Sequence, residues 1–321
     1  MGAGHLGKIH LKCIQQIPLY DLVGFYDPDA ATARQVEATG VRCFGTVEEL
    51  IDSVDVVDIV TPTVQHFACA SKALGRRRHV FIEKPVVATP EEAAKLIELA
   101  DASGVKVQVG HVERFNPAFI AAEPYLTTPK FIEAHRLALF NPRGTDVPVV
   151  LDLMVHDLDI LLTIVNAPVS RVSACGVAAV SSTPDITNAR IEFENGTVAT
   201  LTASRISLKN MRKMRIFQDN AYITVDFLEK KTEIIRIHDE VTKGYPYSLT
   251  LDLADGATRQ LTLERPEIHP INAIQTELES FYDSIIHNTT PVVSISDGVK
   301  VLNLAYDILR AADTSFKKMA R

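Results

Sequence analysis

The sequence predicts a two-part α/β protein, in which a doubly wound parallel sheet is followed by a mostly antiparallel open sheet. Strand-like and helix-like segments alternate up to about residue 116, which is typical of a parallel sheet with helices on both faces. Beyond residue 116, strand-like runs follow one another between turn signals. The chain has 321 residues, enough for two domains with separate cores. We therefore divide it into residues 1–116 and residues 117–321.

The expected elements of the first part follow in a regular order. Apolar runs that read as buried strands cover residues 22–26, 54–60, 79–82 and 105–109. Helices are expected over residues 6–17 and 48–53, from residue 65 onward, and over residues 90–103, the last with Thr89 as N-cap. This alternation predicts a doubly wound, Rossmann-type sheet.

The second part has a different order of expected strands and helices. We expect a strand over residues 131–140, an apolar helix over 152–165, and a series of strands between 171 and 263. Hairpin turns are indicated at Asn195-Gly196 and Asp255-Gly256. Helices over 271–287 and 297–317 close the chain, and we expect the last to pack back on the first domain. The result is an α+β domain whose open sheet has helices on one face.

Glycines at the N-terminus form the G-x-G-x-x-G fingerprint of a dinucleotide-binding turn, at Gly2, Gly4 and Gly7. The first glycine permits a tight turn, the second lets the backbone approach a pyrophosphate, and the third lets the helix pack closely. Asp27 ends the next apolar run and is placed to bind the ribose hydroxyls, which favours NAD over NADP. The alternative for Asp27 is a turn residue ahead of Pro28.

A strand normally leads into such a fingerprint, and in this sequence only Met1 precedes Gly2. That strand is central in a Rossmann sheet, so losing about five buried apolar residues would remove roughly 8–15 kcal/mol. This is comparable to the whole stability of a domain. We therefore expect the natural polypeptide to begin several residues upstream.

The tripeptide Glu83-Lys84-Pro85 follows the buried run 79–82. Open α/β sheets bind their ligands at the carboxyl ends of the strands, which is where this lysine lies. A buried lysine at this position can shift its pKa and take part in proton transfer. The alternative is a solvated loop lysine. The fingerprint upstream favours the functional interpretation.

A second candidate group lies in the apolar helix of the second part. Asp152 and His156 are four residues apart, so they share one helix face. Histidine titrates near neutral pH, and a neighbouring carboxylate can fix its tautomer. The alternative is a buried structural histidine near a helix start that favours acids. We expect no metal here, because no third ligand has helical spacing.

Basic and polar residues recur at positions that suit an anionic substrate. A cluster after the strand at 105–109 contains Arg114 and Asn116, and basic residues follow at Arg136, Arg143, Arg205 and Lys209. Arginine binds phosphates bidentately, so together these residues predict an anion site. For any one of them the alternative is a solvated charged surface.

Composition excludes several classes of function. The net charge of −7 gives no general affinity for nucleic acid or membranes. We find no apolar run long enough to span a bilayer and no signal peptide, so we expect a cytoplasmic protein. The four cysteines have no zinc-binding or C-x-x-C spacing and are expected to be reduced thiols.

With these motifs assembled, the chain resembles the Gfo/Idh/MocA family of oxidoreductases along essentially its whole length. The resemblance implies that Lys84 and His156 flank a reacting carbinol and that Asp152 orients the substrate or the histidine. It also places the T-P-x-x-x-H loop near NAD. The implied cofactor-binding residues are Gly2, Gly4, His5, Leu6, Gly7, Asp27, Thr61, Pro62, His66, Glu83 and Pro85.

Segments around Arg114, Arg136, Arg143 and Arg205 resemble a narrower group, the bacterial UDP-N-acetylglucosamine 3-dehydrogenases, which serve lipid A synthesis. This implies oxidation at C3 of a nucleotide sugar by a homodimer or homotetramer. Two alternatives stay open. The first is a dehydrogenase of inositol, a free aldose or another nucleotide sugar. The second is a regulator that binds NAD without turnover, although both Lys84 and His156 are present.

Overall fold

The computed structural model describes residues 1–141, 147–241, 243–254 and 256–319. The chain forms two compact units. The first consists of Met1–Phe115 and Asn272–Asn303, and the second of Asn116–Ile271 and Leu304–Arg321. The first unit therefore takes in residues 272–303, which the division of the sequence at residue 116 assigned to the second part.

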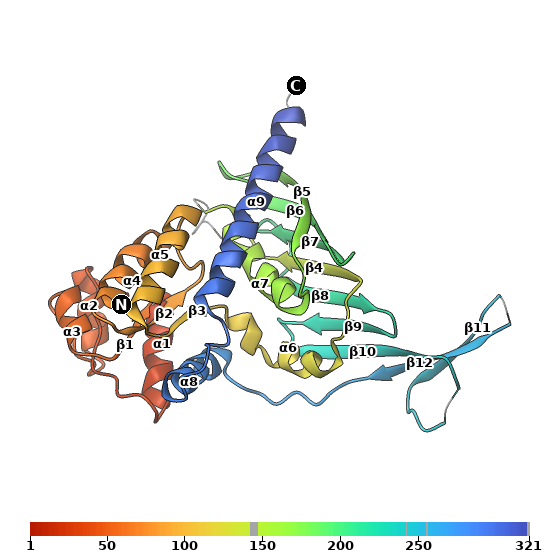
Figure 1. Cartoon of the computed structure of the whole chain (residues 1–321), viewed down its shortest axis with the longest axis horizontal. Coiled ribbons are helices and arrows are strands. Elements are labelled where there is room, and N and C mark those ends of the chain that lie inside the picture. Colours follow the sequence, from red (N-terminus) through yellow and green to blue (C-terminus); the bar gives the residue numbers. More distant parts are fainter. Residues whose placement is uncertain (142–146, 242, 255, 320–321) are drawn as a thin grey trace. The chain divides into compact units, whose positions relative to one another are not determined.

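The first unit contains a parallel sheet in the order β1 (Val56–Ile59), β2 (His79–Glu83), β3 (Val107–Gly110). Figure 1 shows helices packed around these strands. The helices are α1 (His5–Gln16), α2 (Ala30–Glu37), α3 (Val47–Asp52), α4 (His66–Gly75), α5 (Pro90–Ser103) and α8 (Ala273–Ile286), with short 3₁₀ turns η1 (Thr63–Gln65) and η2 (Val112–Phe115). The expected Rossmann-type architecture is confirmed.

Helix α5 shows how local sequence sets an element's bounds. The Thr89 hydroxyl accepts a hydrogen bond from the Glu92 amide at 3.2 Å, and Pro90 occupies the first turn, where its missing N–H costs nothing. Gly104 ends the helix in a left-handed conformation with φ of 69°. The helix therefore spans the residues that the sequence predicted.

The apolar run over residues 22–26 is not the strand that we expected. It makes a single parallel bridge between Phe25 and Cys43, and the Gly2 amide donates to Tyr26 O at 3.0 Å. Along its other edge the run borders a cavity rather than a second strand. A strand needs a regular ladder on at least one side, so these few bonds leave the run irregular.

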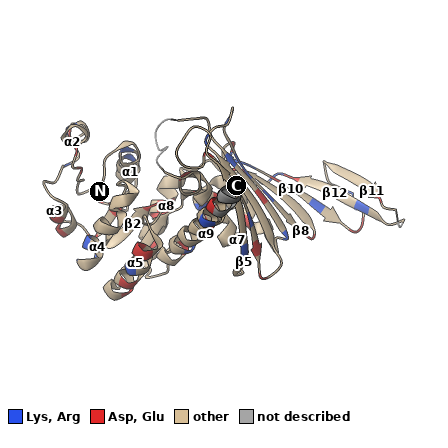
Figure 2. Cartoon of the chain, turned by 90° about the horizontal axis from the view of Figure 1, so that it is seen from above, with Lys and Arg blue, Asp and Glu red and all other residues tan. Residues whose placement is uncertain are grey.

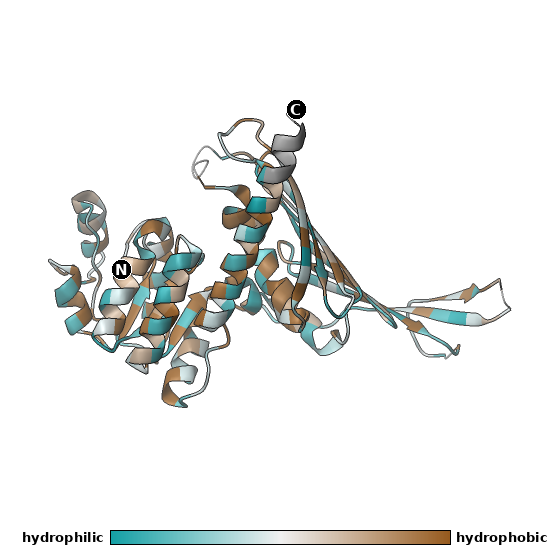
Figure 3. Ribbon diagram, turned by 45° about the horizontal axis from the view of Figure 1, so that its top comes forward, coloured by the Kyte–Doolittle hydropathy of each residue, from teal (hydrophilic) through white to brown (hydrophobic). Residues whose placement is uncertain are grey.

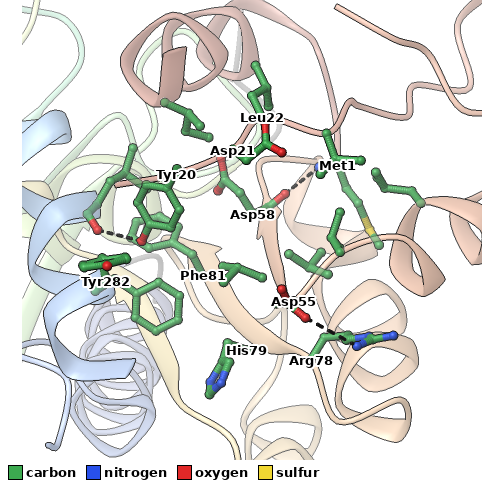
Figure 4. Close-up of a pocket in the computed structure, with 18 of the residues that line it drawn as sticks. Met1, Tyr20, Asp21, Leu22, Asp55, Asp58, Arg78, His79, Phe81 and Tyr282 are labelled. Atoms are coloured by element: carbon green, nitrogen blue, oxygen red, sulfur yellow. Dashed lines mark hydrogen bonds and ion pairs between the residues drawn. The ribbon is translucent and has the colours of Figure 1, made fainter. Parts of the chain in front are cut away.

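The cavity has a volume of about 570 Å³ and lies between residues 22–25 and 54–58 (Figure 4). At the Met1 end of this space, Val60 N–H donates to Met1 O at 2.9 Å, and the Met1 ammonium donates to Asp58 O at 2.5 Å. Phe81 also lines the cavity (Figure 4).

Residues 272–303 join the first unit because they complete its sheet edge and its core. The Val109 amide of β3 donates to Val293 O at 3.0 Å, and Gln108 Nε2 donates to Glu277 O at 2.9 Å. The Phe281 ring of α8 meets Phe81 edge-on, with ring centroids 6.1 Å apart. A buried cluster forms around this contact, and it also contains Cys13, Ile17 and Leu278.

The second unit is built on a nine-stranded sheet in the order β11-β12-β10-β9-β8-β4-β7-β6-β5. Its strands are β4 (Phe131–Leu137), β5 (Val169–Val177), β6 (Ile186–Phe193), β7 (Val198–Ser204), β8 (Met211–Gln218), β9 (Ala221–Asp226), β10 (Lys231–His238), β11 (Ser248–Asp252) and β12 (Thr258–Glu264). All pairings are antiparallel except that of β4 with β7. The mostly antiparallel sheet is confirmed.

Helices cover one face of this sheet. α6 (Pro117–Ala122) packs on β9 and β10, and the π-helical turn η4 (Val150–Met154), which leads into α7 (Val155–Ile164), packs on β7. The residues beneath them, such as Ile132, Leu201 and Ile223, are fully or almost fully buried. The unit also holds the 3₁₀ turn η3 (Glu123–Tyr125) and the C-terminal part of α9 (Ile295–Met319).

The opposite face of the sheet is polar and partly exposed. Figure 2 shows Lys and Arg on several of its strands, and Arg215 on β8 pairs with Glu133 on β4 at 2.9 Å. An aromatic row interrupts the charges, because Phe217 lies between Phe131 and Tyr222 with ring centroids 5.7 and 4.6 Å away. Exposed or half-buried positions alternate with buried ones along the central strands β4, β8 and β9, as is common in an open sheet with one covered face.

Two kinds of feature are absent from the part of the chain that the structure describes. None of its helices combines the length and the hydropathy needed to cross a bilayer. Within the same residues, no group of three or more His, Cys, Asp or Glu side chains is arranged to hold a metal ion. The four cysteines are not joined in disulfides.

Replacing Phe281 with alanine should lower the free energy of unfolding by about 3–5 kcal/mol, because the ring is fully buried against Phe81. The control is Ile286→Ala on the same helix, which is 59% exposed and should change stability by no more than about 0.5 kcal/mol. Urea denaturation followed by circular dichroism measures both. Equal losses in the two variants would contradict a core role for α8.

Candidate active site

The fingerprint turn is built so tightly that two of its positions accept only glycine. Gly2 has φ of +82°, and a Cβ there would lie 2.7 Å from Val60 O. A Cβ on Gly7 would lie 2.1 Å from Gly2 O. The turn therefore holds the start of α1 close to the first residues of the loop that follows β1, as the motif predicts.

Gly4 has the opposite surroundings, because a Cβ there would meet nothing within 4 Å. It is exposed together with His5 and Leu6, and no side chain among the described residues caps the N-terminus of α1. The first amides of this helix therefore point toward open space with unsatisfied N–H groups. Such a helix end binds phosphate, so the turn fits the pyrophosphate of a dinucleotide.

Asp27 is half-buried and helps to shape the same turn. Its Oδ2 accepts a hydrogen bond from the Ala3 amide at 2.7 Å, and its Oδ1 accepts one from the Asp29 amide at 2.9 Å. An ionised carboxylate has about four acceptor sites, so capacity remains for ribose hydroxyls. The structure thus brings Asp27 and the three glycines together.

His66 joins two of the predicted loops. It is 1% exposed, and its Nδ1 and Nε2 lie 2.9 Å from Pro85 O and from Thr61 O, respectively. The ring therefore holds the loop after β1 to the turn after β2, while Pro62 is exposed beside it. Thr61 also lies next to the fingerprint, since a Cβ on Gly2 would be 3.0 Å from its amide nitrogen.

The tripeptide Glu83-Lys84-Pro85 lies at the carboxyl end of β2, and the Lys84–Pro85 peptide bond is cis. Lys84 is half-buried. Glu83 is buried, and its Oε2 accepts a hydrogen bond from the Lys84 amide at 3.1 Å. The lysine therefore has the placement at the sheet edge that the sequence predicted.

Sequence reasoning missed two charged residues beneath this turn. His10 of α1 is 1% exposed, with Nδ1 3.0 Å from Asp58 Oδ2 and Nε2 3.2 Å from Glu83 Oε1. Burial alone would lower the pKa of His10, but the attraction of Asp58 and Glu83 outweighs it and raises the pKa to about 11. The sequence signal for this pair was Asp58, a carboxylate inside the apolar run 54–60, because a charge among buried residues needs a partner.

Asp152 and His156 lie in the second unit, and both are half-buried. The expected continuous α-helix begins instead with the π-helical turn η4, where the Asp152 amide donates to Pro148 O at 3.0 Å. α7 starts at Val155, so Asp152 lies in the wide turn and His156 in the helix proper. π-Turns of this kind occur frequently at functional sites.

Arg136 and Asn116 have local partners in the second unit. The Arg136 guanidinium donates two hydrogen bonds to Asp157, both 2.9 Å long, in a pair whose side chains are only 4% and 3% exposed. Asn116 caps α6 through the Ala118 amide and donates to Phe227 O at 3.0 Å. Their roles as substrate ligands stay predictions.

The other predicted anion-binding residues come from different segments of the chain. Arg205 is buried, with Nε 4.0 Å from Asp185 and a hydrogen bond to Val147 O. Arg114 lies in the first unit and donates to Val292 O at 3.1 Å. Lys209 is exposed in the loop between β7 and β8, and Arg143 lies outside the described residues.

Asp185, the ion-pair partner of Arg205, is itself fixed by backbone hydrogen bonds. Its Oδ2 accepts the amides of Ala179, Val180 and Ser181 at 2.7–3.0 Å. Burial would raise the pKa of this carboxyl, but these hydrogen bonds outweigh burial and hold the pKa well below its usual range. Arg205 thus belongs to a network that fixes the loop after β5.

Comparison with known proteins shows which family this chain matches. Residues 1–111 match the model described as oxidoreductase family, NAD-binding Rossmann fold, and residues 138–224 match the GFO/IDH/MocA C-terminal domain. The UDP-N-acetylglucosamine 3-dehydrogenase of Acidithiobacillus ferrooxidans is 35% identical over 321 residues, which cover 99% of this chain and 97% of that protein.

Two solved structures have the same architecture. The UDP-N-acetylglucosamine 3-dehydrogenase from Acidithiobacillus ferrooxidans has a TM-score of 0.88 at 35% identity, covering 98% of this chain and 96% of that one. The scyllo-inositol dehydrogenase from Lactobacillus casei, solved with NAD(H) and scyllo-inositol, has a TM-score of 0.77 at 19% identity over the same shares, and thus shares the fold. Because both domain models match in order and one relative aligns along nearly the whole chain, the chain belongs to the Gfo/Idh/MocA family of NAD-dependent oxidoreductases.

Proposed function

We propose that the protein oxidises the C3 hydroxyl of UDP-N-acetylglucosamine with NAD. The observation that carries this proposal is the 35% identity, over 99% of the chain, to a relative with that activity in its name. The presence of Lys84, Asp152 and His156 at the family's motif positions supports it. The protein would then be a cytoplasmic enzyme whose 3-keto product is aminated in lipid A synthesis.

The first unit would hold the cofactor. The amides at the start of α1 would bind the pyrophosphate, since the space beside Gly4 is open. Asp27 would accept hydrogen bonds from the adenosine ribose, and the loop tied down by His66 would border the nicotinamide end. The chemistry that NAD supplies when bound is the acceptance of a hydride.

The proton would be handled by this chain's own side chains. His156 would accept the hydroxyl proton as general base, and Lys84 would donate a hydrogen bond to the same oxygen. Oxidation to a ketone would require the carbinol to give up a hydride, which NAD would accept when bound, and a proton, which His156 would accept. Asp152 would orient the histidine or the sugar.

The basic residues would divide into two groups. Arg136 and Arg205 lie against Asp157 and Asp185, so we assign them to holding the frame of the second unit. Lys209 is exposed, and we propose it as a ligand of the diphosphate, for which Arg114 and Arg143 are further candidates. Asn116 would contribute through the helix that it caps.

We also propose that the protein is a homodimer or homotetramer. The polar sheet face with its aromatic row supports this, as does the hairpin of β11 and β12, on which Figure 3 shows hydrophobic residues. Leu249 and Tyr247 on that hairpin are 59% and 62% exposed. Monomeric proteins rarely expose contiguous apolar patches of large size. Light scattering in solution gives the mass that tests this proposal.

Incubation of the protein with NAD and UDP-N-acetylglucosamine should yield NADH together with a sugar that has lost two hydrogens. Absorbance detects the reduced cofactor, and mass spectrometry detects the sugar. Inositol and free N-acetylglucosamine serve as comparison substrates. Faster oxidation of either of these would overturn the nucleotide sugar assignment, and NAD binding without turnover of any sugar would favour a regulator.

Replacing His156 or Lys84 with alanine should lower kcat by about 10²–10⁴-fold while NAD still binds, because each change removes a proton-handling group. His135→Ala provides the control, since this half-buried histidine lies on the polar face of β4. Steady-state kinetics and titration of NAD binding measure the two effects. A variant with the parent's kcat would remove that residue from the mechanism.

Asp27→Asn should reduce the preference for NAD over NADP by about tenfold or more, equivalent to about 1.4 kcal/mol. The amide keeps an acceptor for the Ala3 N–H but loses the charge that repels the additional phosphate of NADP. Asp29→Asn changes the neighbouring carboxylate, which caps α2, and should leave the preference unchanged. Unchanged cofactor preference in Asp27→Asn would argue against a ribose contact.

A further inference from the structure

We propose that His10 is a positioning residue for Lys84, because its ring fixes the Glu83 carboxylate that in turn holds the Lys84 backbone. This inference rests on the proposed function, in which Lys84 acts on the substrate. It concerns only the first unit, where all the residues involved lie.

Three elements meet at the His10 ring. His10 comes from α1, Asp58 from β1 and Glu83 from the last position of β2. The ring nitrogens lie 3.0 Å from Asp58 Oδ2 and 3.2 Å from Glu83 Oε1, and the ring plane meets Phe81 edge-on at 5.8 Å. The histidine is therefore hydrogen-bonded to Asp58 through Nδ1, lies within ion-pair distance of Glu83 through Nε2, and contacts Phe81 with one edge.

The Glu83 side chain is confined on its other sides as well. A Cβ on Gly110 of β3 would lie 2.9 Å from Glu83 Oε1, so the carboxylate packs directly on the neighbouring strand. Its Oε2 accepts the Lys84 amide at 3.1 Å. A displacement of this carboxylate would therefore be passed on to the lysine's own peptide unit.

The arrangement requires a doubly protonated ring. A neutral imidazole carries one N–H, whereas carboxylates face both nitrogens here, so only the imidazolium satisfies both. Burial opposes this charge, but Asp58 and Glu83 outweigh burial and raise the pKa of His10 to about 11. The cation therefore persists through the pH range in which a dehydrogenase works. It also places a positive charge between the buried Glu83 carboxylate and the half-buried carboxylate of Asp58.

The first experiment compares three variants by kinetics. In His10→Gln the new amide can donate to one carboxylate, while its oxygen faces the other, so we expect Glu83 to move and kcat to fall by up to about 100-fold. In the double variant His10→Gln/Asp58→Asn, the asparagine amide can donate to the glutamine oxygen, and the glutamine amide can donate to Glu83, so kcat should recover. Asp58→Asn alone leaves a ring that can still donate to Glu83, and should be close to the parent.

A merely structural role would give a different pattern. Positioning predicts that His10→Gln lowers kcat while KM for the sugar and the affinity for NAD stay within about threefold. His287→Gln, which changes an exposed histidine in the same unit, is the control and should match the parent. The proposal is overturned if His10→Gln, folded at the assay temperature, keeps the parent's kcat, or if kcat, KM and NAD affinity all worsen together.

A second experiment does not depend on activity, so it separates this proposal from the proposed function. In protein with ¹³C-labelled histidine and lysine, the His10 resonance, assigned by its loss in His10→Gln, should not titrate between pH 5 and 9. The Lys84 resonance, assigned with Lys84→Arg, should shift in His10→Gln and stay in place in His287→Gln. Titration of His10 near its ordinary pKa, or an unmoved Lys84 resonance, would overturn the proposal.

Discussion

Parallel pairing of β1, β2 and β3 is the constraint on which the candidate cofactor site depends. Ile59 lies opposite Ile82, and Glu83 opposite Gly110, so the three strands end at one edge of the sheet. Loops that are far apart in the sequence, after β1 and after β2, thereby reach His66 and can be joined by its ring. The fingerprint turn is placed at the same edge by the close contact of Gly2 with Val60.

Much of the first unit was predictable because its signals are local. The bounds of α5, the fingerprint glycines and the placement of the tripeptide at Glu83 follow from caps, turn chemistry and a buried run. The contact between His10 and Glu83 was not predictable, since it joins residues of two elements whose packing no spacing rule describes. The same holds for Val293, which pairs with β3 from a distant part of the chain.

Basic residues show a further limit of sequence reasoning. Arg136 and Arg205 read as candidates for an anion site, yet the structure places each beside a buried aspartate. The sequence alone does not show where a charged side chain lies in the fold. Whether a guanidinium faces a ligand or a carboxylate depends on its position in the fold and on what packs over it. Arg136 occupies a buried position of β4, beneath the helix that carries Asp157.

The π-helical turn η4 has a consequence for how this protein can change over evolutionary time. A π-turn holds one residue more than the corresponding turn of an α-helix, so a single deletion within Val150–Met154 would restore regular α-helix. Each residue of an α-helix rotates the chain by about 100°, so everything before the deletion would swing around the axis relative to α7. A deletion at Leu153 or Met154 would turn Asp152 relative to His156 without substituting either residue, so the length of this turn affects their relative orientation as well as their identity does.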